Sequence, residues 1–109
     1  MFFYPLKDFV KDIQEVFNVE ADDVAGIAGP ETLLETITLS EVLNRKHPVI
    51  YLIQRRLYVL GYTEVGKING VANGNFTAAV KRFQADNGCY ITGEITARDK
   101  TWKKLLGME

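Results

Sequence analysis

Leu52-Ile53-Gln54-Arg55-Arg56-Leu57 places an apolar residue directly before a glutamine on the core side of a predicted helix. The same apolar-glutamine pair recurs as Ile13-Gln14 and as Phe83-Gln84. A glycine-rich turn follows each pair and leads to a threonine ahead of further apolar residues. Glycine permits positive φ, and threonine or asparagine side chains cap the helix that follows. The repeat therefore predicts units of helix, glycine turn and helix, with turns at Ala25-Gly26, Asn69-Gly70 and Thr92-Gly93.

Apolar residues at helical spacing predict four helices. The first has Asp8 as its N-cap, and the second begins at His47-Pro48 and stops at Gly61. The third is capped by Asn75 and stops at Gly88. The expected core stripes, in chain order, are Phe9, Val10, Ile13, Val16 and Phe17; Val49, Leu52, Ile53, Leu57 and Leu60; Phe76, Ala79, Val80 and Phe83; and Trp102, Leu105 and Leu106.

The fourth helix is short. We expect it to open on a capping box from Thr96 to Asp99 and to close at Gly107. A further helix is expected over about residues 30–37, with a connection after it. Because no segment has convincing strand character, the predicted fold class is all-α. Residues 1–46 are expected to form a partial helical repeat that packs on a complete module over residues 47–109.

Composition limits the possible partners. The 109 residues carry a formal net charge of −1, which does not favour nucleic acid, because such binders need a basic surface. No stretch approaches the ~18 apolar residues of a membrane span. The start, Met1-Phe2-Phe3-Tyr4-Pro5-Leu6, is too short for the apolar region of a signal peptide and lacks a cationic start. A protein working outside the cell is then expected to be a fragment or to leave by another route.

The ordered combination of these stretches resembles the peptidoglycan-binding domain family. The resemblance rests on Leu52-Ile53-Gln54-Arg55-Arg56-Leu57, Gly61-Tyr62, Asn69-Gly70, Thr77, Ala79-Val80-Lys81-Arg82-Phe83-Gln84 and Thr101-Trp102-Lys103-Lys104-Leu105. It covers about residues 48–107, and residues 8–37 resemble a shortened copy. The aspartate that the family places before the turn glycine is absent from all three turns, so no ligand role is carried over to it. Asn69-Gly70 keeps the turn chemistry, which suggests a structural role.

The resemblance implies a small orthogonal three-helix bundle that binds peptidoglycan and anchors a hydrolase to this insoluble substrate. Its location is expected to be extracellular or at the cell wall. The ending after Gly93 resembles the C-terminal tails of clostridial and phage-type N-acetylmuramoyl-L-alanine amidases. Two alternatives stay open: a protein-interaction module with the same bundle, and the C-terminal fragment of an amidase.

Catalysis by this chain is not expected. A zinc amidase needs two or three histidines with a carboxylate or cysteine, whereas His47 is the only histidine and Cys89 the only cysteine. We interpret His47 as a capping or connecting residue and Cys89 as buried. No metal and no cofactor are predicted, although a longer parent protein is compatible with a fused zinc amidase.

Tyr51, Arg55, Tyr58 and Tyr62 recur at i, i+4, i+7 and i+11, on the side opposite Val49, Ile53 and Leu60. Tyrosines offer flat apolar area and a hydroxyl for sugar or peptide contact. The alternative is that this stripe docks the N-terminal repeat through Phe9, Val16 and Phe17. The ligand-contact candidates are Arg55, Tyr58, Tyr62, Asn69, Asn73 and Asn75.

Overall fold

The computed structural model describes residues 4–16, 38–96 and 100–107. The helix expected at 30–37, the first glycine turn at Ala25-Gly26, Phe17 and the capping residue Asp99 all lie outside these residues. Within them, the helices are α1 (Leu6–Val16), α3 (Pro48–Val59), the short 3₁₀ helix η1 (Thr63–Val65), α4 (Gly74–Asp86) and α5 (Lys100–Leu105).

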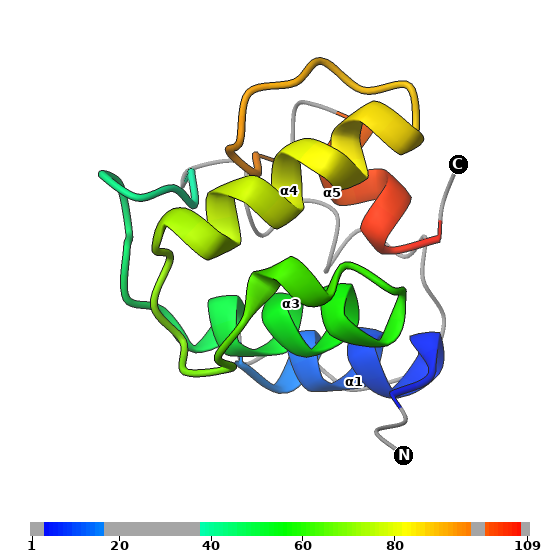
Figure 1. Ribbon diagram of the computed structural model, residues 1–109. Coiled ribbons are helices and arrows are strands. Elements are labelled where there is room, and N and C mark those ends of the chain that lie inside the picture. The colour runs from blue at the N-terminus through cyan, green and yellow to red at the C-terminus, as the bar shows by residue number, and fades with distance from the viewer. Residues whose placement is uncertain (1–3, 17–37, 97–99, 108–109) are drawn as a thin grey trace.

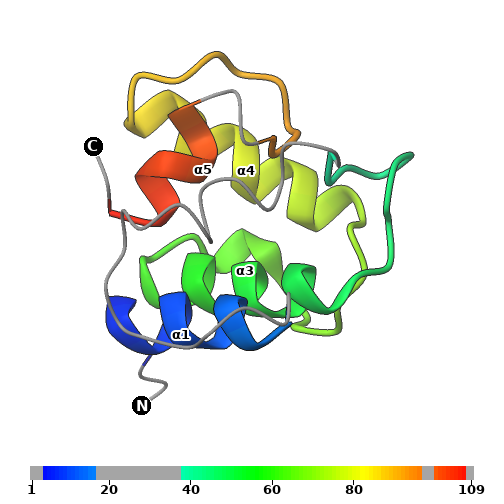
Figure 2. The same ribbon diagram turned by 180° about the vertical axis from the view of Figure 1, so that it is seen from behind.

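The described residues contain no extended strand, and the predicted all-α class is confirmed. Two isolated antiparallel bridges join connecting segments, Leu39 with Ile95 and Lys46 with Val71. Helix α3 lies in the middle, with α1 along one side of it and α4 on the other, and α5 lies beside α4 (Figure 1). The view from behind shows the same order (Figure 2).

Helix α3 begins and ends as predicted. His47 is its N-cap, Pro48 is its first residue, and Gly61 leaves the helix at a φ of 102°. Proline suits the first helical position because that N–H has no partner within the helix. Leu60, expected in the core, is instead 41% exposed because it is the C-cap, where the chain already turns away.

Two predicted helix caps are wrong. Helix α4 begins at Gly74, so its cap is Asn73, whose Oδ1 accepts a hydrogen bond from the Phe76 N–H at 3.0 Å, and Asn75 lies within the first turn. Helix α1 begins at Leu6. Asp8 therefore lies in its first turn, where a carboxylate interacts favourably with the helix dipole.

One hydrophobic core unites α1 with the later helices. Its largest fully buried side chains include Phe9 from α1, Ile53 and Leu57 from α3, Phe76 from α4 and Trp102 from α5. The residues expected on the core stripes are thus mostly buried, with Val16 at the end of α1 as a second exception to the pattern at 36% exposure. Cys89, expected to be buried, is only partly buried because it follows the end of α4 in a surface turn.

Gln54 and Gln84 are buried and bind the backbone of the two glycine turns that the structure describes. Gln54 Oε1 accepts hydrogen bonds from the N–H groups of Asn69 and Gly70, both at 2.9 Å, and its Nε2 donates to Val71 O at 3.0 Å. Gly70 has a φ of 78°, and this conformation, which glycine adopts at little cost, allows consecutive N–H groups to share one acceptor. The side-chain amide of Gln54 therefore fixes the turn between α3 and α4.

Gln84 repeats this arrangement at the second described turn. Its Oε1 accepts from the N–H groups of Thr92 and Gly93, both at 2.9 Å. Its Nε2 lies 2.9 Å from Thr101 Oγ1 and 3.1 Å from Glu94 O. Gln84 and Thr101 are fully buried. One side chain on α4 thus binds both the turn after α4 and the start of α5.

We predict that Gln84→Leu lowers the free energy of unfolding by about 2–4 kcal/mol. Leucine has a similar size but removes the acceptor of the Thr92 and Gly93 N–H groups and the donor to the buried Thr101 hydroxyl. Urea denaturation followed by circular dichroism measures the change. Glu15→Leu, at an exposed position of α1, is the control for adding leucine and should stay within about 0.5 kcal/mol of the wild type. Equal stability of Gln84→Leu and the wild type would contradict the prediction.

Candidate functional site

The outer face of α3 presents aromatic side chains around a guanidinium group. Tyr51 is 44% exposed and Tyr58 is 39% exposed. Between them lies Arg55, whose guanidinium carbon is 5.8 Å from the centre of the Tyr51 ring and 4.0 Å from the centre of the Tyr4 ring. We call Tyr51, Arg55 and Tyr58 the α3 tyrosine face. A guanidinium stacked on aromatic rings is attracted to their faces, and this attraction helps to hold the Arg55 side chain against Tyr4 and Tyr51.

Tyr4 attaches the residues before α1 to this face. The Tyr4 hydroxyl donates to Asp12 Oδ2 at 2.6 Å, and the backbone carbonyl oxygen of Tyr4 accepts from Arg56 Nη1 at 3.0 Å. Burial, followed by the hydrogen bond to Asp12, raises the pKa of Tyr4 well above its ordinary value, so the hydroxyl stays protonated as a donor. Arg55 therefore contacts the N-terminal segment while the two tyrosines keep exposed area. Of the predicted docking partners, Phe9 is buried in the core and Val16 is partly exposed.

The glycine turn held by Gln54 borders the α3 tyrosine face. A Cβ on Gly70 would lie 3.8 Å from Tyr51 Cβ. Asn69, the candidate at this turn, has structural contacts: its Oδ1 accepts from the Val71 N–H at 3.0 Å and from Gln54 Nε2 at 3.3 Å. Asn73, a second candidate, caps α4. Both side chains thus take part in the local structure that carries the face.

Asn75 lies elsewhere, where η1 meets the start of α4. A Cβ on Gly66 would lie 2.8 Å from Asn75 Nδ2, which is too close for any other residue without movement. Gly66 also has a φ of 71°. Asn75 itself is exposed. This contact helps to lay the segment after α3 along α4.

Tyr62 does not continue the stripe of α3, and that geometric prediction is wrong. Because α3 ends at Val59 and Gly61 turns the chain, Tyr62 lies between α3 and α4 and is only 9% exposed. Its ring meets Phe83 edge to face, with the centroids 5.6 Å apart, and its hydroxyl donates to Asp86 Oδ2 at 2.9 Å. Burial and this hydrogen bond raise its pKa. Its role in ligand contact stays a prediction.

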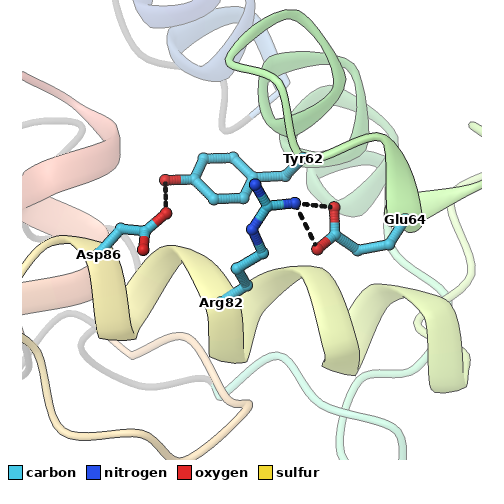
Figure 3. A network of polar contacts seen from close by, with 4 residues as sticks. All are labelled: Tyr62, Glu64, Arg82 and Asp86. Carbon is cyan, nitrogen blue, oxygen red and sulfur yellow. Dashed lines mark hydrogen bonds and ion pairs between the residues drawn. The ribbon is translucent and has the colours of Figure 1, made fainter.

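Arg82 completes the polar network around Tyr62 (Figure 3). Its guanidinium carbon lies 5.1 Å from the centre of the Tyr62 ring, and its Nη1 donates to both oxygens of Glu64 at 3.0 and 2.9 Å. The hydrogen bond from Arg82 lowers the pKa of Glu64. Since Arg82 is well exposed, the pair contributes little to stability. Its effect is to orient the segment from Tyr62 to Glu64 along α4.

The structure therefore divides the candidate residues. Arg55 and Tyr58 lie on the α3 tyrosine face with Tyr51, and Asn69 is at the turn that borders it. Tyr62 and Asn75 belong to the contact of residues 62–66 with α4. Sequence reasoning missed Tyr4, because nothing in the pattern before α1 indicates that its ring lies against a side chain of α3.

His47 has a capping geometry, as interpreted from the sequence. Its Nδ1 accepts a hydrogen bond from the Val49 N–H at 3.1 Å. Burial lowers its pKa, since the charged imidazolium is less well solvated there. Among the described residues, no group of three or more histidine, cysteine, aspartate or glutamate side chains is placed to hold a metal ion. Nor does that part of the chain contain a helix long and apolar enough to cross a membrane.

Both described glutamine-bound turns lie within residues that match one known protein family. Residues 46–105 match the family described as "Putative peptidoglycan binding domain". The chain belongs to this family. The match includes α3, η1, α4 and α5, with Gln54 and Gln84 and the turns that they hold. No curated protein matches the chain.

The peptidoglycan-binding module is thus a binding domain by family, and peptidoglycan is the ligand that the family implies. This points to the cell wall as the place where it works. Helix α1 and the segment from 38 to 45 lie outside the matched residues. They pack on the module through Tyr4, through the shared core and through the bridge from Leu39 to Ile95.

We predict that the stability of this peptidoglycan-binding module falls as the pH decreases below the ordinary histidine pKa of 6.5. The folded state lowers the pKa of His47, so in this range the unfolded chain binds the proton more readily and the free energy of unfolding decreases until the folded pKa is passed. Above 6.5 both states hold neutral imidazole, and this contribution to stability is complete.

Urea denaturation from about pH 5 to about pH 7.5 measures the effect. This range extends roughly one pH unit or more to each side of the ordinary histidine pKa. His47→Ser is the control, because serine keeps a capping oxygen that does not titrate. Its stability should depend less on pH in this interval than that of the wild type. Parallel pH profiles of the two proteins would show that His47 is not the group responsible.

Proposed function

We propose that this module anchors a cell-wall hydrolase on peptidoglycan and that the α3 tyrosine face makes the contact. Family membership supports the ligand. The observation that carries the choice of face is the exposure of Tyr51 and Tyr58 on either side of a stacked Arg55. The catalytic domain, in this proposal, is fused to the module in a longer protein.

The chemistry of the face suits a wall polymer. Exposed phenol rings offer flat apolar area to sugar rings or peptide, and each carries a hydroxyl that can hydrogen-bond. Arg55 adds a positive charge beside the rings, and this charge attracts the carboxylates of a stem peptide. Because Tyr4 holds its guanidinium at 4.0 Å, little side-chain entropy remains to be lost on binding.

Weak binding is sufficient for anchoring. A tethered module raises the effective concentration of its catalytic partner at an insoluble substrate without any new contact by that partner. Arg55 and Tyr58 are therefore the first contact residues in this proposal. Asn69, Tyr62, Asn73 and Asn75 are secondary candidates, because each has a turn, packing or capping contact within the fold.

We predict that the double variant Tyr51→Ala/Tyr58→Ala binds purified peptidoglycan sacculi at least about tenfold more weakly than the wild type, because it removes two aromatic contacts. Co-sedimentation at low salt over a range of sacculus concentrations measures the binding. Tyr90→Ala is the matched control: Tyr90 is 87% exposed and lies after α4, outside the face. It should bind as the wild type does.

Thermal unfolding of the same variants separates contact from docking. Unchanged stability with lost binding supports a contact face, whereas a large loss of stability in the double variant shows that the tyrosines serve to pack the N-terminal segment. A wild-type chain that fails to sediment with sacculi overturns the anchoring proposal and leaves a protein-interaction role for the same bundle.

A further inference from the structure

A small pocket lies at the turn that Gln84 holds. Its volume is about 170 Å³, and it is lined by residues 40–42, Thr77 and residues 92–94. Binding sites for whole small molecules are commonly about 300–1,000 Å³. This pocket is therefore of a size for one side chain or a group of similar bulk. We call it the Glu41–Glu94 pocket.

Two segments form the pocket, and one of them lies outside the family match. Residues 40–42 precede the matched residues, whereas Thr77 and residues 92–94 belong to them. The bridge between Leu39 and Ile95 joins the two segments, with N–H to O distances of 3.0 and 3.1 Å in the two directions. In Figure 1, the segment after residue 38 runs beside the start of α4. One wall of the pocket is thus supplied by residues that precede the family match.

Internal hydrogen bonds hold both walls in place. The buried Ser40 hydroxyl accepts from the Val42 and Leu43 N–H groups at 3.2 and 3.0 Å. On the opposite wall, Thr92 Oγ1 accepts from the Glu94 N–H at 3.1 Å, and Gln84 holds the Thr92 and Gly93 N–H groups. These hydroxyls are occupied within the walls. The carboxylates of Glu41 and Glu94 remain as the charged groups of the lining.

Neither carboxylate takes part in an ion pair or accepts a side-chain hydrogen bond within the described residues. Glu41 Oε1 lies over the first residue of α4, 3.5 Å from where a Cβ on Gly74 would be. Glu94 is half-buried on the facing wall. Lys81 borders the pocket, since its Cε would lie 3.2 Å from a Cβ on Gly93. Two carboxylates against one bordering ammonium leave the pocket negatively charged, and like charges in one recess favour a bound cation.

We propose that the Glu41–Glu94 pocket receives the side-chain ammonium of the diamino acid in the peptidoglycan stem peptide. This rests on the proposed function for the nature of the ligand. An ammonium on an aliphatic chain matches the pocket in size and charge, and Val42, a lining residue that is 83% exposed, offers apolar contact for the methylene groups. This pocket would let the module recognise the stem peptide at a site separate from the α3 tyrosine face.

The test titrates the full chain with the tripeptide L-Ala-γ-D-Glu-L-Lys, its meso-diaminopimelate counterpart, and a lysine tripeptide acetylated on the side-chain amine. Amide chemical shifts at Thr77 and residues 92–94 report binding in the pocket. The double variant Glu41→Gln/Glu94→Gln keeps the shape and should bind the free-amine peptides about tenfold more weakly. Glu15→Gln, an equal charge change on exposed α1, should bind as the wild type does.

The acetylated peptide should bind the wild type about as weakly as the free-amine peptide binds the double variant. The proposal is overturned if acetylation leaves affinity unchanged, or if the double variant, folded by circular dichroism, binds as the wild type does. Tighter binding of one free-amine peptide identifies the diamino acid that the pocket accepts. Sedimentation with sacculi is measured in parallel. If the wild type sediments but its peptide affinity does not depend on the side-chain amine, the pocket proposal alone is overturned. If the wild type binds the free-amine peptides but does not sediment, the anchoring proposal alone is overturned.

Discussion

The rest of the structure depends on the side-chain amides of Gln54 and Gln84. Each lies fully buried and gives one oxygen to two successive N–H groups of a glycine turn. A buried amide is stable only when its donors and acceptor are used. Helix and turn therefore fix each other, since the turn satisfies the glutamine and the glutamine satisfies backbone groups that no regular element pairs. A small bundle with short helices gains from this a defined path for its connections, which hydrophobic burial alone does not provide.

Each glutamine also positions one of the two proposed contact surfaces. Gln54 fixes the Gly70 turn, and that turn packs against Tyr51 at the edge of the α3 tyrosine face. Gln84 fixes residues 92–94, which form one wall of the Glu41–Glu94 pocket, and through Thr101 it joins that wall to α5. Surface residues on such turns lose little freedom when a ligand binds, because the turn is already held. The same internal contact thus serves stability and preorganisation.

Local patterns were sufficient to predict most of the fold. Helical periodicity located α1, α3, α4 and α5, His47-Pro48 marked the start of α3, and the recurring apolar-glutamine pair located the turns. The predictions failed where a contact far along the sequence decides the outcome. Tyr62 follows the helical spacing of α3 in the sequence, but Gly61 redirects it towards Phe83 and Asp86. Asn73 and Asn75 lie on either side of Gly74, and both are residue types that cap helices. Asn73 is the cap, whereas Asn75 contacts Gly66, and no local sequence pattern indicates that contact.

The residues outside the family match explain why this chain differs from an isolated module. The Tyr4 ring stacks on Arg55 and its carbonyl accepts from Arg56, so the N-terminal segment takes one side of α3 and orients the guanidinium that the α3 tyrosine face presents. The segment at 39–42 bridges to Ile95 and places Glu41 on the wall that faces Glu94. Both additions act by packing on turns and faces that the glutamines have already fixed. If those turns were mobile, ordering them would cost conformational entropy, and this cost would offset the few contacts that each added segment makes. Neither segment could then hold a charged group at a defined distance from the module.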